Sequence, residues 1–329
     1  MQNQLRKLFS NKVFLLSFAF AFAFVFLIVA PYFLDNYWLR IFTNMFMFAI
    51  LAASWNIIAG YCGYAAFGNV VFFGVGSYTT AVLMVNQVDF FLSILIAALV
   101  CALYAATLGL PILRLKGHYF AVATIGINEG TRELINNMEG LTHGAEGLSL
   151  PMIALSPKLS YVFFYFLMLI ILIIVIALTY FLTKSRVGFA FRSIRSNEEA
   201  ALVTGINAAY YKTIAWAVSA FFTGLTGGVY AYWVGFIDTE SVFSISITVK
   251  MIVMALVGGL GTILGPVIGA FIFELISETL WSTFTNFHAV ILGAMIMIIV
   301  LFIPGGLVEL IKSKFSMAAF KRKLKESKV

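Results

Sequence analysis

Charged residues are scarce in this chain, and proline, histidine and cysteine are scarcer still. Of its 329 residues, 11% are charged and 62% are hydrophobic, with 6 prolines, 3 histidines and 2 cysteines. Soluble domains are about 25% charged and about 45–50% apolar, so the composition excludes a water-soluble enzyme and a disordered regulator. Cys62 and Cys101 are too few for a disulfide framework or a cysteine metal site. The composition indicates an integral membrane protein.

Motifs for nucleotide binding and hydrolysis are also absent. No Gly-Lys dipeptide occurs, so the chain has no phosphate-binding loop of the GxxxxGK[ST] type. The glycines from Gly259 to Gly265 miss the GxGxxG spacing and follow an apolar segment, as in a turn between helices. No HExxH or GxSxG pattern is present. We therefore expect no catalytic residue, metal site or cofactor in this chain, and any ATP hydrolysis that drives it must occur in another chain.

Long apolar runs are abundant. A transmembrane helix needs about 20 apolar residues, and ten segments approach that length. They are residues 13–34, 38–58, 65–85, 90–113, 119–138, 161–183, 210–234, 243–257, 267–281 and 289–303. The fifth, eighth and ninth are the weakest because they are charged or short, and the first is too long for a signal peptide. We predict an all-α membrane protein with about ten (8–10) transmembrane helices.

The basic residues indicate how these segments are oriented. With the N-terminus inside the cell, all of the 21 lysines and arginines fall on inner flanks except four. The exceptions are Arg40, Arg132, Lys158 and Lys250. Because cytoplasmic flanks retain positive charge, both termini are predicted to be cytoplasmic. The net charge of +7 therefore reflects topology, and we expect no nucleic-acid partner.

A short helix is predicted in the polar segment 184–209, which falls inside. Its N-cap is expected at Asn197, two acids follow in the first turn where the helix dipole favours them, and a glycine ends it. The residues of this pattern are Glu198, Glu199, Ala200, Ala201 and Gly205. The pattern resembles the EAA loop of ABC importer permeases, whose helix docks on the ATPase and transmits its movement. A solvated helical linker is the alternative.

Four further blocks, in order along the chain, resemble the LivM-type permeases of branched-chain amino acid ABC importers. They are GYCGYAAFGNVVFFGVGSYT at 60–79, LRLKGHYFA at 113–121, LTHGAEGL at 141–148 and VGGLGTILGPVIG at 257–269. The first block departs from the family at Cys62, Tyr64 and Asn69, where Ala or Pro, Gln and His are more usual. The resemblance covers about residues 38–306 and implies the ABC importer permease fold.

The resemblance also implies a function and a set of partners. The chain would be a permease subunit of an importer for leucine, isoleucine and valine in a bacterial-type inner membrane. Its partners would be a homologous second permease, two ABC ATPases that bind ATP and Mg, and an extracytoplasmic substrate-binding protein. The outer loop 136–158 is a candidate to receive this binding protein, and an ordinary solvated loop is the alternative. Residues 1–12 would be a cytoplasmic N-terminus, 13–306 the transmembrane domain within the lipid bilayer, and 307–329 a basic cytoplasmic tail.

Two other functions remain open. The same type of permease serves urea, short amides or another small polar solute. A stand-alone ion-coupled carrier belongs to a different class, and the predicted coupling helix has no role in it.

Glycines and charges within the apolar segments are candidates for the translocation path or its gate. They are Gly60, Gly63, Gly68, Gly74, Glu129, Arg132, Glu133 and Lys250. Glycines in a membrane mark either close helix packing or backbone that lines a cavity. Charges there are costly and are default functional candidates, although structural ion pairs are the alternative. Arg132 is spaced to pair with Glu129, and Lys250 can be neutralised by the acids of the ninth segment.

Overall fold

The computed structural model describes residues 26–151, 153, 155–283, 293 and 297. Residues 26–33, at the end of the first predicted membrane segment, are helical. The predicted N-terminus, residues 13–25 of the first segment, most of the tenth segment and the basic tail lie outside the described residues.

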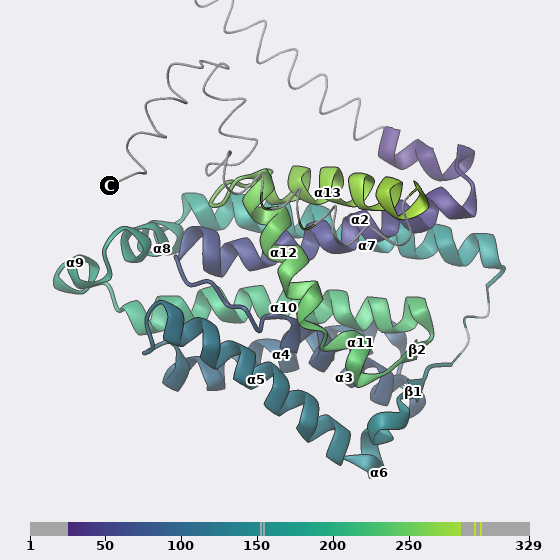
Figure 1. The fold of residues 1–329 in the computed structure, drawn as a ribbon, viewed down its shortest axis with the longest axis horizontal. Helices are drawn as coiled ribbons and strands as arrows, with labels where there is room; N and C mark the ends of the chain where they lie inside the picture. Colours follow the sequence, from purple (N-terminus) through teal and green to yellow (C-terminus); the bar gives the residue numbers. More distant parts are fainter. Residues whose placement is uncertain (1–25, 152, 154, 284–292, 294–296, 298–329) are drawn as a thin grey trace, which may run out of the picture.

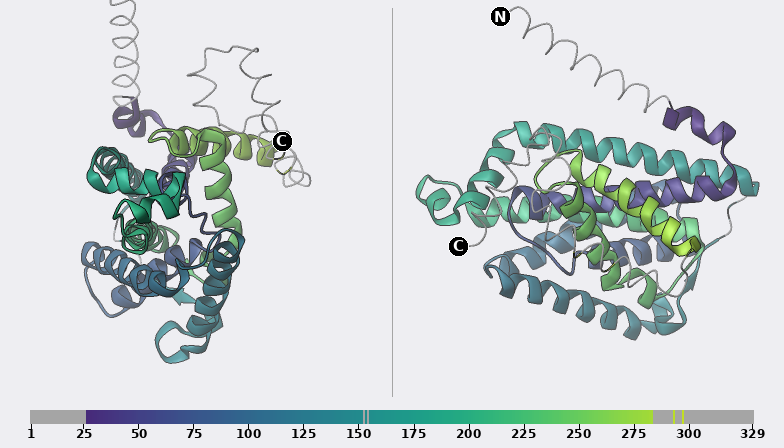
Figure 2. Two further views of the ribbon diagram at one scale, coloured as in Figure 1. Left: turned by 90° about the vertical axis from the view of Figure 1, so that its left-hand side faces the viewer. Right: turned by 45° about the horizontal axis from the view of Figure 1, so that its top comes forward.

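A long buried helix forms the centre of the fold. α2 (Asn36–Asn56) continues into a π-helical stretch, η1 (Ile57–Tyr61). α7 (Pro157–Lys184), α10 (Ala208–Val234), α12 (Ile245–Gly258) and α13 (Gly265–Thr283) all contact α2. On the far side of α10 lie α3 (Val70–Val85) and α4 (Phe90–Ile112). Apart from α12, these helices run roughly along the longest axis of the molecule, and α12 crosses them obliquely (Figure 1, Figure 2).

Local signals account for where several helices begin and end. The Asp89 carboxylate accepts hydrogen bonds from the first amides of α4, and the Asn207 side chain does the same for α10. Such side chains satisfy amides that have no partner within the helix. α7 begins with a proline, which suits a first helical turn. α10 ends at Gly235, which adopts a left-handed conformation with φ of 77°.

Five described segments are long and apolar enough to cross a membrane. They are Asn36–Tyr61, Phe90–Ile112, Pro157–Lys184, Ala208–Val234 and Thr239–Gly258. The helical, multi-pass prediction is therefore confirmed, but the count of about ten spans is not. α5 (His118–Asn137) and α13 are helices at the predicted fifth and ninth positions and are not among the five, and α3 is shorter. The predicted eighth segment, 243–257, corresponds to α12, and the short helix α11 (Thr239–Val242) precedes it.

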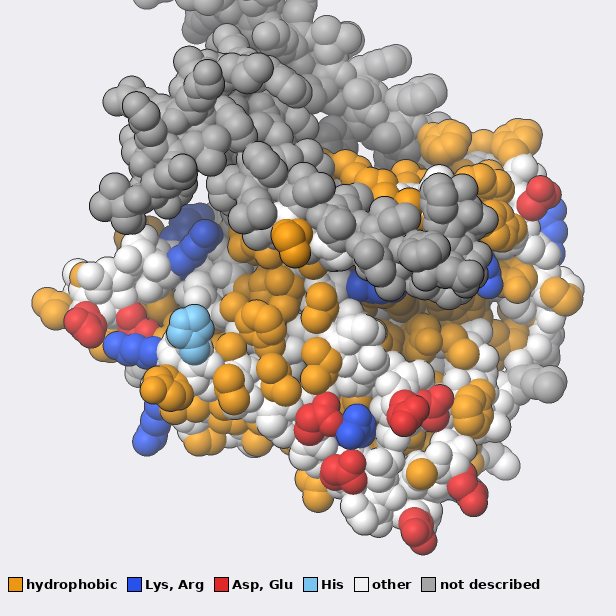
Figure 3. Space-filling view, viewed as in Figure 1, with side chains coloured by type: hydrophobic (Ala, Val, Ile, Leu, Met, Phe, Trp, Pro, Cys, Tyr) orange, Lys and Arg blue, Asp and Glu red, His pale blue; other side chains and the backbone are white. Residues whose placement is uncertain are grey.

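Polar structure gathers at the two ends of the bundle. α8 (Arg186–Ser196) and α9 (Glu198–Val203) lie at one end. α6 (Glu139–Thr142), η2 (Gly144–Glu146) and the antiparallel strands β1 (Leu148–Ser149) and β2 (Phe236–Ile237) lie at the other (Figure 1). In the space-filling view, charged side chains cluster toward these ends and hydrophobic side chains cover the middle (Figure 3). The two polar segments thus lie at opposite ends, as the predicted topology requires.

Candidate functional site

Helix α9 is fixed by its own sequence. Asn197 Oδ1 accepts a hydrogen bond from the Ala200 amide at 3.0 Å, which is the predicted N-cap. Gly205 has φ of +85° and donates to the Leu202 carbonyl, while the Ile206 amide donates to the Ala201 carbonyl. This pair of bonds is the Schellman arrangement that ends helices at glycine. Both predicted ends of the helix are therefore present.

The two glutamates of α9 have different environments. The Glu198 side chain is only 18% exposed, and its Oε1 lies 2.8 Å from Lys212 Nζ. The Glu199 side chain is 83% exposed and lies 3.4 Å from Lys116 Nζ. Partial burial acts to raise the pKa of Glu198, but hydrogen bonds from Lys212 and Tyr64 and the charge of Lys212 outweigh it, so the pKa falls below its usual range. Glu198 therefore faces the protein as a carboxylate, and Glu199 faces outward.

Lys212 holds Glu198 from the first turns of α10. It is 3% exposed, and its ammonium donates to Glu198, to Tyr64 Oη at 2.9 Å and to the Leu113 carbonyl at 2.7 Å. These bonds use all three donors of the ammonium group. Tyr64 Oη in turn donates to the second Glu198 oxygen, and burial, followed by this bond, raises the pKa of Tyr64. We call Tyr64, Leu113, Glu198 and Lys212 the anchor cluster.

Lys212 was predicted only to mark the topology, and its role in holding Glu198 was not foreseen from the sequence. A lysine inside an apolar helix is itself a signal, because a buried charge is retained only with partners. Tyr64, one of the residues that differ from the resembled family, is one of those partners. Asn69, another such residue, also bonds to α10: its buried side chain forms hydrogen bonds with Trp216, Ser219 and Thr223.

The outer face of α9 carries apolar side chains as well as Glu199. Leu202 is 52% exposed and Val203 is 89% exposed. Neighbouring Ala201 is buried, and Ala200 lies on the exposed side. The helix thus presents a small surface of mixed character at the end of the bundle.

The four glycines predicted for the path or gate lie against neighbouring atoms. A Cβ at Gly60 would meet Asn56 and Gly261, and one at Gly68 would meet the Thr124 carbonyl. A Cβ at Gly74 would meet the Phe243 ring. Gly63 has φ of +85° and packs on Arg195. All four therefore make close contacts within the described fold.

The charges predicted in the fifth segment form the expected ion pair. On α5, Arg132 lies 2.9 Å from Glu129 and 3.6 Å from Glu133. Their side chains are 34% to 60% exposed, and they do not line the two chambers described below.

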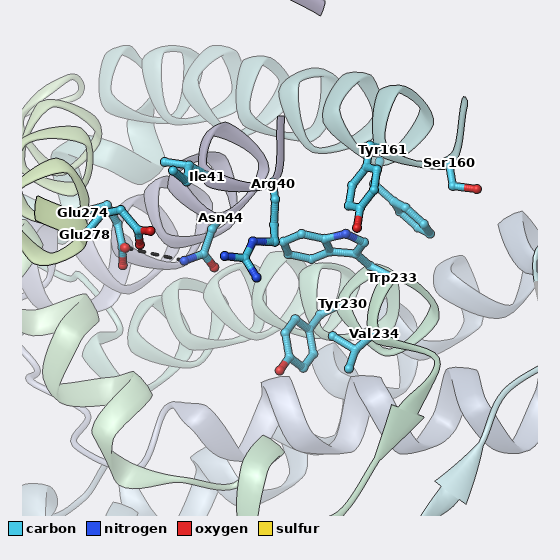
Figure 4. A pocket seen from close by; sticks show the side chains of 11 residues that line it. Arg40, Ile41, Asn44, Ser160, Tyr161, Tyr230, Trp233, Val234, Glu274 and Glu278 are labelled. Carbon is cyan, nitrogen blue, oxygen red and sulfur yellow. Dashed lines mark hydrogen bonds between the residues drawn. The ribbon is translucent and has the colours of Figure 1, made fainter. Parts of the chain in front are cut away.

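A chamber of about 530 Å³ opens between α2, α7, α10 and α13 (Figure 4). It is lined by Arg40, Ile41, Asn44, Ser160, Tyr161, Phe164, Tyr230, Trp233, Val234, Glu274 and Glu278. A second chamber of about 540 Å³ shares Asn44 and Tyr230 with the first and includes the predicted path residue Lys250. The two chambers are therefore neighbours near the end of the bundle that carries the strands.

Both signs of charge meet in the first chamber. Glu274 is 6% exposed, and one of its carboxylate oxygens lies 3.5 Å from Asn44 Nδ2. Its other oxygen has no hydrogen-bond partner among the described residues. Arg40 extends toward Asn44, while Tyr161 and Trp233 form an aromatic side (Figure 4). Such a lining suits a small solute with charged or polar groups and an apolar part.

Within the described ranges, no group of three or more His, Cys, Asp or Glu side chains is placed to hold a metal ion.

Comparison with known proteins identifies the family. The family model described as "Branched-chain amino acid transport system / permease component" matches residues 37–300. The LivM permease protein of the high-affinity branched-chain amino acid transport system of Escherichia coli (strain K12) is 25% identical, over 87% of this chain and 73% of its own. No solved structure matches the chain significantly.

Two other relatives differ in their described substrates. The LivH permease protein of the high-affinity branched-chain amino acid system of Salmonella typhimurium is 22% identical, over 79% of this chain and 90% of its own. The autoinducer 2 import system permease protein LsrC of Yersinia pestis (strain Pestoides F) is 25% identical, over 63% of this chain and 55% of its own.

Proposed function

This chain belongs to the family of branched-chain amino acid transport system permease components, and from that premise we propose that it is a transmembrane subunit of an ATP-driven importer for leucine, isoleucine and valine. The observation that carries the proposal is α9. It is a helix capped at both ends, held on its inner side by a buried ion pair, with Glu199, Leu202 and Val203 turned outward. A surface of this kind suits docking into a groove of a partner ATPase.

The proposed mechanism is alternating access driven by other chains. Both termini and α9 face the cytoplasm of a bacterial-type inner membrane, and a loaded binding protein engages the opposite end, near β1 and β2. ATP closes a pair of ATPases, α9 passes their movement to the membrane helices, and substrate moves along a path formed with a homologous second permease. The similarity to both LivM and LivH supports such a pair.

The residues predicted for the path divide into two groups under this proposal. Lys250 and the chamber charges lie where a zwitterionic amino acid can meet both signs of charge beside aromatic side chains. Gly60, Gly63, Gly68 and Gly74 shape the backbone around η1 and α3. Glu129, Arg132 and Glu133 are partly exposed on α5, where a second permease would meet them.

A different small polar solute, such as urea or a short amide, is the second candidate substrate. The similarity to LsrC favours it, because that permease belongs to a system for another kind of solute.

The first test of the proposal is uptake of labelled leucine by energised cells with and without this chain. Loss of uptake on deletion, with competition by valine but not by urea, is expected. Unchanged leucine uptake, in cells where no second system masks the loss, would indicate that the substrate is urea or another solute instead.

A second test addresses α9. Glu199→Arg reverses the charge of the outer face, so it should abolish uptake and loosen ATPase binding while the chain stays in the membrane. Lys116→Met is the matched control, because it removes the same exposed ion pair without changing α9 itself. Exposed pairs contribute little stability, so this variant should transport normally. Normal uptake by Glu199→Arg would refute the coupling role.

A further inference from the structure

Two sets of hydrogen bonds, which we call tie points, join the segment that carries α9 to the membrane helices. The first is the anchor cluster, where one buried ammonium group connects α9, the start of α10, the end of α4 and the loop before α3. Because Lys212 is buried with all three donors used, α9 has little freedom to move without α10.

The second tie point lies one helix earlier. Arg195, at the end of α8, donates a hydrogen bond from its guanidinium to the Gly60 carbonyl in η1. The backbone at Gly63 leaves room for this side chain, since a Cβ there would stand 3.2 Å from Arg195 Cγ. π-Helical turns are uncommon and frequently occur at functional sites.

From η1 the contacts continue to the turn between α12 and α13. Asn56 Oδ1 accepts from the Gly261 amide at 2.8 Å, and Asn56 Nδ2 donates to the Thr262 carbonyl at 2.9 Å. Gly261 has φ of +74° and also lies against the Arg195 guanidinium. The end of α8, the π-helical end of α2 and this turn therefore form one connected unit.

We propose that Lys212 and Arg195 are positioning residues of the coupling step. Lys212 passes a displacement of α9 to α10, and Arg195 passes it to η1 and onward to the α12–α13 turn. α10 and α13 also line the first chamber, so both routes end on helices that border it. This inference rests on the proposed function and adds to it the residues through which movement travels.

The test measures coupling rather than activity alone. The complete importer, with both permeases, the ATPases and leucine-loaded binding protein, is reconstituted in liposomes, and ATP hydrolysed per leucine transported is recorded. Lys212→Met and Arg195→Met are compared with matched controls. Lys116→Met breaks the exposed ion pair of the same helix α9, and Arg192→Met removes the neighbouring arginine, which bonds only to the nearby Thr183 carbonyl among the described residues.

Lys212→Met and Arg195→Met should retain the ATPases and their basal hydrolysis. Their ATP consumed per leucine should rise about tenfold, within the usual range of coupling between sites, while both controls stay near the wild-type ratio. Tyr64→Phe is a milder variant that tests the proposal even if Lys212→Met fails to fold, because it keeps the ring and removes only the hydroxyl between Lys212 and Glu198. It should raise the ratio in the same direction.

Three results would overturn the inference. One is a wild-type ratio in Lys212→Met and Arg195→Met. Another is loss of uptake and of ATP hydrolysis in proportion, which indicates a merely structural role. The third is a wild-type ratio in Tyr64→Phe. A wild-type importer that does not transport leucine at all refutes the proposed function instead, so the two failures are distinguishable.

Discussion

Replacing Gly76 by alanine tests how closely α3 and α10 pack. Gly76 lies inside α3, and a Cβ added there would stand 2.6 Å from the Cα of Gly224 in α10. The obstacle is backbone rather than the end of a side chain, so the helices must separate. Gly126 of α5 is a matched control, because a Cβ there meets no described atom within 4 Å.

Both substitutions change the helix propensity by the same amount, and they differ in the steric cost of packing. Both gain up to about 1 kcal/mol of helix propensity when glycine becomes alanine. Only Gly76→Ala overpacks a helix contact, which destabilises by about 1–3 kcal/mol. Because the propensity gain cancels between the variants, their difference in unfolding free energy equals the steric part.

The assay is the midpoint of thermal unfolding of the purified chain in lipid nanodiscs. Gly76→Ala should unfold several degrees below Gly126→Ala, and Gly126→Ala should not fall below the wild type. Equal midpoints for the two variants would refute this account of the glycines in α3 as packing residues.

Three further predictions concern α9 and the cysteines. The fold lowers the pKa of Glu198, so the stability from its ion pair with Lys212 is present above the ordinary pKa of 4.5 and is lost as pH falls through the folded pKa. The difference in thermal midpoint between wild type and Glu198→Gln should therefore be constant near neutral pH and shrink in acid. A difference that stays constant at all pH values would contradict this prediction. Asn197→Ala removes a cap worth about 1 kcal/mol, so amide exchange should accelerate in α9; unchanged exchange would show that the cap contributes nothing. Cys62 and Cys101 are buried, and burial raises the pKa of the Cys62 thiol to about 12. Neither cysteine should therefore react with a maleimide until the protein is denatured. Rapid labelling of the native chain would contradict their buried placement.

Short-range features of the fold could be predicted from the sequence. Asn197 and Gly205 define α9 because capping depends on residues a few positions apart. The Arg132–Glu129 pair follows from helical spacing in the same way. The apolar runs predicted most of the long helices for a similar reason, since composition and length decide them.

Contacts between distant segments were beyond prediction. The bond from Lys212 to Tyr64 joins residues 148 positions apart, and the first chamber needs four helices to be placed together. Periodicity shows that a helix is apolar, but it does not show which neighbour the helix packs against. The opposite directions of Glu198 and Glu199 likewise depend on where α10 places Lys212.

The side of the membrane on which α9 lies tests the central claim most directly. Single cysteines at Val203, which is 89% exposed on α9, and at Leu141, which is 50% exposed on α6, are introduced into a chain without Cys62 and Cys101. A membrane-impermeant maleimide is then applied to intact cells and to inside-out vesicles from which the ATPases have been removed, so that the outer face of α9 is uncovered. We expect Val203→Cys to be labelled only in the vesicles and Leu141→Cys only in the cells. Labelling of Val203→Cys in intact cells would place α9 out of reach of ATPases in the cytoplasm and contradict the account.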